Sequence, residues 1–144
     1  MINLQKFLDD AYEIGIRNPD KWLQGRCFNW GFLRGAFPRG CVPSDCDGEI
    51  EINGHFLRYE MKYVDAVRKQ RMGIGQERHL KALVKTGFFT VFVVGHDDKM
   101  ECKCVRIWHQ TPQGFTEKYK RECDNQEVFE LSKNWSDYAE KIMP

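Results

Sequence analysis

A chain of 144 residues is long enough to bury one sizeable core, and we expect residues 1–144 to form a single domain. Its 42% hydrophobic and 30% charged residues are typical of a globular protein and exclude a disordered one, while a formal net charge of +1 excludes a polycation. No apolar run approaches the roughly 18 residues of a membrane span, and the first residues do not form a signal peptide. We therefore expect a cytoplasmic protein without a membrane partner.

Residues 2–14 carry apolar side chains at helical spacing, which predicts a first helix with Asn3 as its N-cap. Residues 25–42 follow with four glycines among arginines and aromatic residues, a composition that argues against one regular element. Arginine interleaved with aromatic side chains can bind a nucleic-acid strand by phosphate pairing and stacking, and Arg34 and Arg39 are our candidates for such contacts. Packing of the same segment over a sheet edge is an equally good interpretation.

Residues 46–62 read as a β-hairpin. Asn53-Gly54 between two alternating segments is the strongest local signal for a two-residue type I′ turn. With this turn, Glu49 faces Arg58 across the strands, and successive side chains alternate between the two faces. One face then carries the apolar side chains that a core needs: Ile50, Ile52, Leu57, Tyr59 and Met61.

The other face of the predicted hairpin gathers charged residues. The register places Asp47 directly opposite Glu60, with Lys62 two residues on and on the same face. Two like charges facing each other across strands are destabilising, unless a divalent cation lies between them. Hard cations such as Mg²⁺ take carboxylate oxygens and keep waters that a substrate phosphate can displace. Two carboxylates and a lysine around a metal form a phosphodiester-cleaving arrangement.

The segments Pro43-Ser44-Asp45-Cys46-Asp47-Gly48 and Glu60-Met61-Lys62 resemble the signature of the PD-(D/E)xK, or restriction-endonuclease-like, nuclease superfamily. The spacing from Asp47 to Glu60 is similar to that of archaeal Holliday-junction resolvases, and the chain looks most like virus-type replication-repair nucleases and small phage nucleases. The resemblance covers about residues 40–95.

This resemblance implies an α/β fold with a restriction-endonuclease-like core. The expected core has a mixed sheet, the antiparallel hairpin at about 46–62, a crossover helix at about 76–86 and a returning strand at about 88–94. Helices near the N- and C-termini are expected to flank it. The helix at 76–86 should turn Leu80, Leu83 and Val84 inward and end at Gly87.

The resemblance also implies a Mg²⁺-dependent endodeoxyribonuclease, with Mn²⁺ as a substitute, that serves phage or bacterial replication, repair or recombination. In the family the metal would be held by Asp47, Glu60 and the main-chain carbonyl of Met61, and Lys62 and Gln76 complete the catalytic set. Its expected compartment is the cytoplasm of a bacterial or phage-infected host cell, and its partner is DNA. A homodimer would serve to cut both strands of a duplex; a nickase or flap enzyme needs none.

Two further acidic residues stay open as contributors to this site. Asp45 faces Lys62 in the same register, and it is either a salt-bridge partner of the lysine or the metal ligand in place of Asp47. Some members of the superfamily use an acid on the first helix, where Glu13 is the best candidate. An exposed helix acid is the simpler interpretation of Glu13.

The stretch from Glu60 to Lys85 holds seven basic residues against three acidic ones and leads out of the expected site. A phosphate backbone would lie against such a surface. Four of its residues are our candidates for DNA contacts: Arg68, Lys69, Arg71 and Arg78. A solvated helix face would give a similar pattern, and a nuclease fold without activity that binds DNA or protein is the main alternative function.

The remaining chain predicts a strand at 88–94 that is covered on both faces, because its apolar run is continuous. Residues 100–109 alternate weakly and predict another strand, whereas residues 110–127 are polar and loop-like. A last helix, capped by Ser132, is expected to turn four apolar side chains to one side: Trp135, Tyr138, Ala139 and Ile142.

Four metal-ligating residues near the C-terminus suggest a different kind of site. Cys102 and Cys104 lie two apart on the expected strand, where their side chains would point the same way. Together with His109 and Cys123 they could bind zinc. Free and partly buried thiols are the simpler interpretation, and disulfides are disfavoured in the cytoplasm.

Overall fold

The computed structural model of the chain describes residues 6, 30–33, 35–40 and 46–142, which belong to two units, Met1–Ser44 and Asp45–Pro144. In the first unit the described residues form two short 3₁₀ helices, Trp30–Leu33 and Pro38–Gly40, and Arg39 is exposed there with a positive φ of 58°. Three residues predicted to contribute to function lie outside the described residues: Glu13, Arg34 and Asp45. The helix expected over residues 2–14 is outside them too, apart from Lys6.

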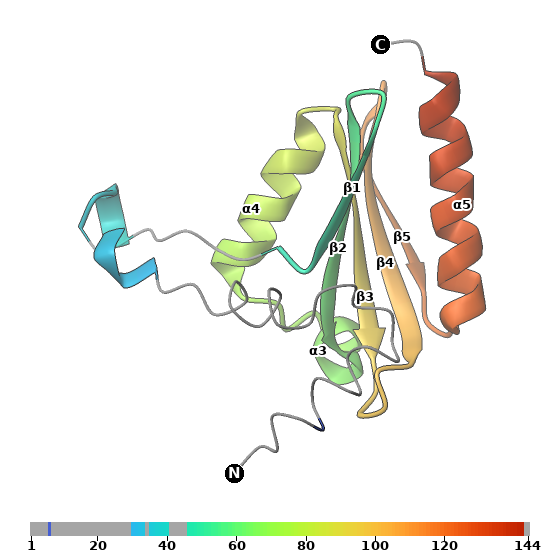
Figure 1. Cartoon of the computed structure of the whole chain (residues 1–144), viewed down its shortest axis with the longest axis horizontal. Helices are drawn as coiled ribbons and strands as arrows, with labels where there is room; N and C mark the ends of the chain where they lie inside the picture. The colour runs from blue at the N-terminus through green and yellow to red at the C-terminus, as the bar shows by residue number, and fades with distance from the viewer. Residues whose placement is uncertain (1–5, 7–29, 34, 41–45, 143–144) are drawn as a thin grey trace. The chain divides into compact units, whose positions relative to one another are not determined.

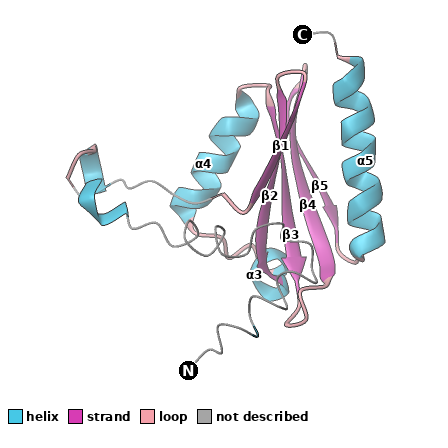
Figure 2. Ribbon diagram, in the orientation of Figure 1, coloured by secondary structure: helices cyan, strands magenta, loops and turns pink. Residues whose placement is uncertain are grey.

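The second unit is a five-stranded mixed sheet with helices on both faces, as Figures 1 and 2 show. Its elements are β1 (Gly48–Ile52), β2 (His55–Tyr63), α3 (Val64–Arg68), α4 (Ile74–Lys85), β3 (Phe89–His96), β4 (Cys102–Thr111), β5 (Gly114–Lys120) and α5 (Asn125–Lys141). The strands lie in the order β1-β2-β3-β4-β5, with β2 and β3 parallel and the other neighbours antiparallel. The expected α/β class and mixed sheet are confirmed.

The hairpin forms in the register that its turn dictates. Asn53 and Gly54 have φ of 53° and 78°, the positive values that a type I′ turn requires. Glu49 pairs with Arg58 as predicted, and their side chains form an ion pair of 2.6 Å. Asn53 also donates from Nδ2 to the carbonyl of Ala139, 3.3 Å away, so the turn is bound to the last turn of α5.

The crossover from β2 to β3 uses two helices, of which one was predicted. α4 begins at Ile74, two residues earlier than expected; Leu80 and Val84 are buried beneath it, and Gly87 follows its end with φ of +85°. α3 has no counterpart among the predicted elements. Five residues are too few to show a helical period, and only Val64 and Val67 of α3 are buried.

Two core clusters lie on opposite faces of the sheet. The helices α3 and α4 cover one face, and α5 covers the other (Figure 1). β3 contributes Val91 and Val93 to the first cluster and Phe92 and Val94 to the second. The prediction of a strand covered on both faces is therefore confirmed.

The C-terminal third contains more regular structure than expected. β4 confirms the strand predicted at 100–109, but the loop predicted for 110–127 is wrong, because β5 and the start of α5 occupy it. Asp124 is the N-cap of α5, and its carboxylate and that of Glu127 form a reciprocal capping box. None of the described helices has the length and apolar character of a membrane-spanning segment.

Ser132 does not cap a helix, in contrast to the prediction. It lies within α5, where its hydroxyl donates to the carbonyl of Val128 at 2.7 Å and accepts from the hydroxyl of Tyr59 at 2.6 Å. Of the apolar residues expected on one side of this helix, Trp135 and Ala139 are buried. Tyr138 is exposed, and Ile142 lies just beyond the helix end.

Candidate active site

Three of the predicted catalytic side chains are in direct contact on the face of β2 that turns toward α3 and α4. Glu60 is 5% exposed, and the Nζ atom of Lys62 lies 3.2 Å from its Oε1. Gln76, in the first turn of α4, donates from Nε2 to the same carboxylate oxygen. The hairpin thus supplies two of these groups and the crossover helix supplies the third.

Asp47 reaches the same part of β2 by a different route from the one predicted. The ladder of the hairpin ends at the pair Gly48–Tyr59, and Asp47 forms a bend, so it is not the strand partner of Glu60. Its Oδ2 instead accepts a hydrogen bond from the N–H of Met61 at 2.8 Å. In the alternating antiparallel pattern, Met61 is the next residue whose N–H and C=O face β1. The Asp47 carboxylate therefore takes the place of the main-chain acceptor that a longer ladder would supply.

The oxygen atoms at this position fit a hard cation. Asp47 Oδ1 and Glu60 Oε2 have no partner among the described residues, and the carbonyl of Met61 points to the same edge as its N–H. One or two carboxylates with several retained waters is how Mg²⁺ is usually bound, in contrast to an all-protein cage. The described part of the chain holds no group of three or more His, Cys, Asp or Glu side chains suited to a metal.

Glu60 and Lys62 differ in how far their side chains are buried. The side chain of Glu60 is 6% exposed, whereas that of Lys62 is 31% exposed. A buried carboxylate without a cation or hydrogen bonds is strongly unfavourable, and Lys62 and Gln76 supply Glu60 with both. Lys62 remains open to solvent on one side and can reach a substrate there.

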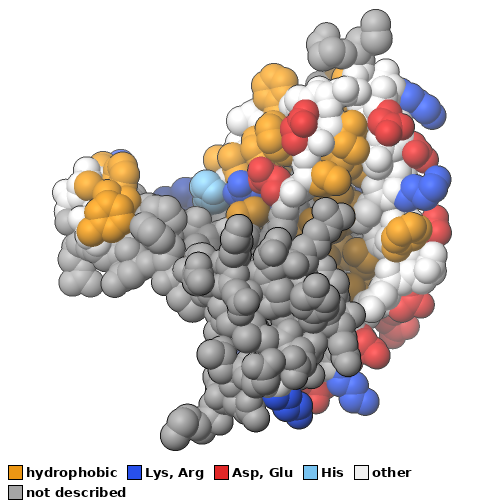
Figure 3. Space-filling model, in the orientation of Figure 1, with side chains coloured by type: hydrophobic (Ala, Val, Ile, Leu, Met, Phe, Trp, Pro, Cys, Tyr) orange, Lys and Arg blue, Asp and Glu red, His pale blue; other side chains and the backbone are white. Residues whose placement is uncertain are grey.

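The candidate DNA contacts that the structure describes all lie on the surface. Arg68 and Lys69 end α3, Arg71 lies in the connection to α4, and Arg78 is on α4. Lys69 lies 3.9 Å from Asp65, whereas the three arginines form no ion pair with any described residue. The surface near α5 differs, because acidic and basic side chains are mixed along that side of the molecule in Figure 3.

The four residues considered for zinc do not form one site. Gly95 pairs with Cys104 and His96 with Cys102, so Lys103 is an extra residue in β4. This bulge turns Cys104 into the core beneath α3 and α4 and Cys102 toward the core beneath α5. The expectation that both thiols point the same way is wrong. His109 lies farther along β4 and contacts Thr90 at 3.0 Å, and burial raises the pKa of Cys123 to about 11, which opposes the thiolate that zinc requires.

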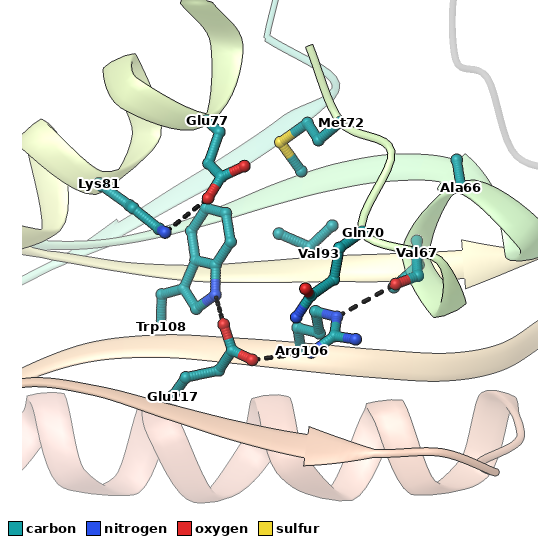
Figure 4. Close-up of a pocket in the computed structure, with 10 residues that line it drawn as sticks. All are labelled: Ala66, Val67, Gln70, Met72, Glu77, Lys81, Val93, Arg106, Trp108 and Glu117. Carbon is teal, nitrogen blue, oxygen red and sulfur yellow. Dashed lines mark hydrogen bonds and ion pairs between the residues drawn. The ribbon is translucent and has the colours of Figure 1, made fainter. Parts of the chain in front are cut away.

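A cavity of about 200 Å³ lies on the same face of the sheet, between α3, α4 and the strands β3, β4 and β5 (Figure 4). Glu117 accepts hydrogen bonds there from Arg106 and Trp108, each at 2.7 Å, and Lys81 lies 2.5 Å from Glu77. These charged groups satisfy one another, which indicates a structural network.

Sequence reasoning missed these residues because β5 was interpreted as a loop. Its alternation of Phe115, Glu117 and Tyr119 was the signal that could have found it.

No protein-family model, curated protein or solved structure gives a significant match to this chain. The contacts of Lys62 and Gln76 with Glu60, and of Asp47 with the main chain of Met61, are therefore the observations from which a function can be argued. They bring together β2, the residue before β1 and the first turn of α4, with the ammonium of Lys62 and the amide of Gln76 on one oxygen of the Glu60 carboxylate.

Proposed function

We propose that this chain is a metal-dependent endonuclease that hydrolyses phosphodiester bonds in DNA, and that its second unit is a restriction-endonuclease-like core. The observation that carries the proposal is the shared contact of Lys62 and Gln76 with one oxygen of the buried Glu60, beside the Asp47–Met61 hydrogen bond. The order of hairpin, crossover helix and parallel strand supports it, because the PD-(D/E)xK signature requires this topology around its acids and lysine.

Asp47, Glu60 and the carbonyl of Met61 would hold Mg²⁺ or Mn²⁺ through their oxygens. Such an ion lowers the pKa of a bound water and neutralises charge on the phosphoryl oxygens during in-line attack. Glu60 and Asp47 contribute fixed negative charge on the side away from the substrate. Their place in the hairpin, where Asp47 is tied to the main chain of β2, limits how far the two carboxylates can move apart.

Lys62 and Gln76 act on the substrate side of the acids. The Lys62 ammonium, partly exposed, would stabilise the extra negative charge that develops on the phosphate oxygens as the water attacks. Gln76 keeps the Glu60 carboxylate oriented through its Nε2, and its own Oε1 has no partner among the described residues. That carbonyl oxygen is available to accept a hydrogen bond from the attacking water.

The test is cleavage of plasmid and of labelled branched, single-stranded and duplex DNA, with an RNA of the same sequence, in Mg²⁺, Mn²⁺, Ca²⁺ or EDTA. We expect cleavage with Mg²⁺ and Mn²⁺ alone, and a loss on the order of 10²-fold or more in Lys62→Ala and Asp47→Ala. Lys99→Ala and Asp98→Ala, in the exposed turn between β3 and β4, remove the same charges as matched controls and should leave cleavage unchanged.

The plasmid products also report on assembly, because nicked circles indicate one active site per encounter and linear product indicates two. Cleavage that persists in EDTA, or that survives both site variants, would show that the proposal is wrong. DNA binding without cleavage under every condition would point to the alternative, a binding module that has kept the fold of a nuclease.

A further inference from the structure

A second pocket, of about 570 Å³, lies where the end of α3, the connection to α4, the strands β4 and β5 and the start of the β5–α5 turn meet. It is lined by Arg68, Gln70, Arg106, Tyr119, Arg121 and Glu122. Arg68 and Arg121 are exposed, and neither guanidinium forms a hydrogen bond or ion pair with another described residue. The lining therefore holds three guanidinium groups and a single carboxylate.

Arg106 is the fixed member of this lining, since it is only 7% exposed. Its Nε donates to the carbonyl of Val67 at 3.1 Å and its Nη1 to Glu117 at 2.7 Å, as Figure 4 shows. Its Cζ atom lies 3.7 Å from the centre of the Tyr119 ring. These contacts hold the guanidinium plane in one orientation, and Nη2 has no hydrogen-bond partner among the described residues.

This pocket and the candidate active site lie on the same face of the sheet. Glu60 pairs with Val93, Val93 with Arg106 and Arg106 with Tyr119, so the four residues form one row across four strands. Three interstrand spacings of about 4.8 Å place Tyr119 roughly 14 Å from Glu60. That separation matches roughly four nucleotides of one strand in duplex DNA, at about 3.4 Å per nucleotide.

The chemistry of the lining favours a phosphate group. A guanidinium presents a planar fork of donors that matches phosphate oxygens, and arginine rather than lysine is preferred where this geometry matters. The neighbouring cavity shares Arg106, but its other charged residues, Lys81, Glu77 and Glu117, are already paired. In this pocket, by contrast, the charges of Arg68 and Arg121 are uncompensated apart from Glu122.

We propose that Arg68, Arg106 and Arg121 form a phosphate subsite that holds a nucleic-acid strand roughly 14 Å from the cleavage centre. The assignment of that strand as the substrate rests on the proposed nuclease function. The phosphate is either an internal phosphodiester or the terminal phosphate of the strand, and both present the same oxygens to the arginines.

The experiment measures binding of labelled single-stranded and duplex oligonucleotides in EDTA, by fluorescence anisotropy over a series of salt concentrations. The full chain is compared with Arg68→Ala/Arg121→Ala and with a control, Lys99→Ala/Lys141→Ala, that removes two exposed charges elsewhere. We expect the arginine variant to bind about tenfold more weakly and to lose about one unit of the slope of log K against log salt. The control should retain most of both.

A third variant, Arg106→Lys, keeps the charge but removes the free Nη2 donor and the guanidinium plane that Val67, Glu117 and Tyr119 hold, and its fold is checked by its melting temperature. It should bind more weakly than wild type at unchanged net charge. Oligonucleotides with and without a 5′-phosphate identify the phosphate: a loss confined to the phosphorylated strand assigns it to the terminus, and a loss with both assigns it to the interior of the strand.

Equal losses in the arginine variant and the control, or an unchanged salt slope, would overturn the subsite. So would competition by polyglutamate as strong as that by an oligonucleotide of equal charge, because the pocket would then be a site for acidic proteins. These outcomes are separate from the nuclease test. If the chain binds DNA through Arg68 and Arg121 but never cuts it, the phosphate subsite is supported and the proposed nuclease activity is refuted.

Discussion

Gly95 is the residue at which a single added methyl group should disturb the face of the sheet that α3 and α4 cover. It lies in β3 between Lys62 of β2 and Cys104 of β4. A Cβ atom at this position would overlap Cys104 Sγ and lie 3.1 Å from the Cα of Val64, a backbone atom of α3. Because α3 follows β2 directly, relief of this overlap must move either the thiol or the helix that begins two residues after Lys62.

The expected cost of Gly95→Ala is a loss of about 2 kcal/mol in the free energy of unfolding. Overfilling a packed core costs about 1–3 kcal/mol, and the gain of about 0.5–1 kcal/mol from replacing a strand glycine offsets part of it. Cys104 is fully buried, so its sulfur has no free space to enter. For a unit of this size the loss corresponds to a fall of about 10 °C in melting temperature.

The steric cause is separated from other causes by a double-mutant cycle. Cys104→Ala alone should cost about 1 kcal/mol for the lost sulfur contacts, and in Gly95→Ala/Cys104→Ala the overlap with Sγ is gone. We therefore expect the double variant to be more stable than the sum of the single losses by about 1 kcal/mol or more.

Urea unfolding, followed by circular dichroism and tryptophan fluorescence, gives these free energies by linear extrapolation. Gly75→Ala, in the first turn of α4 where a Cβ meets nothing within 4 Å, is the control and should not lower the free energy of unfolding. Additive losses in the cycle, or a Gly95→Ala protein as stable as wild type, would refute the reasoning.

Two more predictions concern the stability of the sheet. Glu117→Ala leaves Arg106 and Trp108 without their shared acceptor and should lower the free energy of unfolding by about 2–3 kcal/mol, measured by urea unfolding beside an exposed control, Glu122→Ala. Burial, with a smaller effect of Lys118, lowers the pKa of His109 below its usual 6.5, so the unfolded chain binds this proton more tightly than the folded one. The stability that neutral His109 provides is present above about pH 6.5 and is lost as the pH falls through the lower folded pKa. In His109→Gln the dependence of melting temperature on pH below 6.5 should be weaker, and an unchanged dependence would contradict this assignment.

How far the sequence predicts this fold depends on whether an element is specified locally. Asn53 and Gly54 specify their turn by backbone conformation alone, and the turn then fixes every pair of the hairpin. The continuous apolar run of β3 likewise indicates a strand that is buried on both faces. The helix α3 was not predicted, because five residues are too few to show a helical period. The strand β5 was not predicted, because its lysines make the alternation of its side chains less clear. The start of α5 was available from the sequence, since Asp124 and Glu127 have the spacing of a capping box.

The candidate site was predicted in its residues but not in all of its contacts. The alternation of a strand places Glu60 and Lys62 on one face, and that inference needs only the hairpin. The Asp47 contact could not be derived, because it depends on where the ladder ends, and the chain leaves the ladder one pair early. The prediction that Cys102 and Cys104 point the same way failed for a similar reason. A bulge changes the face of the sheet that a residue occupies, and no local sequence pattern indicated this bulge.

Glu60 is the residue for which packing alone offers no explanation. Its row of the sheet continues into Val93, in the core beneath α3 and α4, where an apolar side chain would avoid the several kcal/mol that burying an ion costs. Lys62 and Gln76 compensate that cost only in part, because a buried ion pair is seldom more stable than well-packed hydrophobic groups of similar volume. Glu60 Oε2 and Asp47 Oδ1 have no partner among the described residues and stay open to water or to an ion. Under the proposed function this cost has a use, because the buried Glu60 and the Asp47 carboxylate tied to the main chain of Met61 would share one cation.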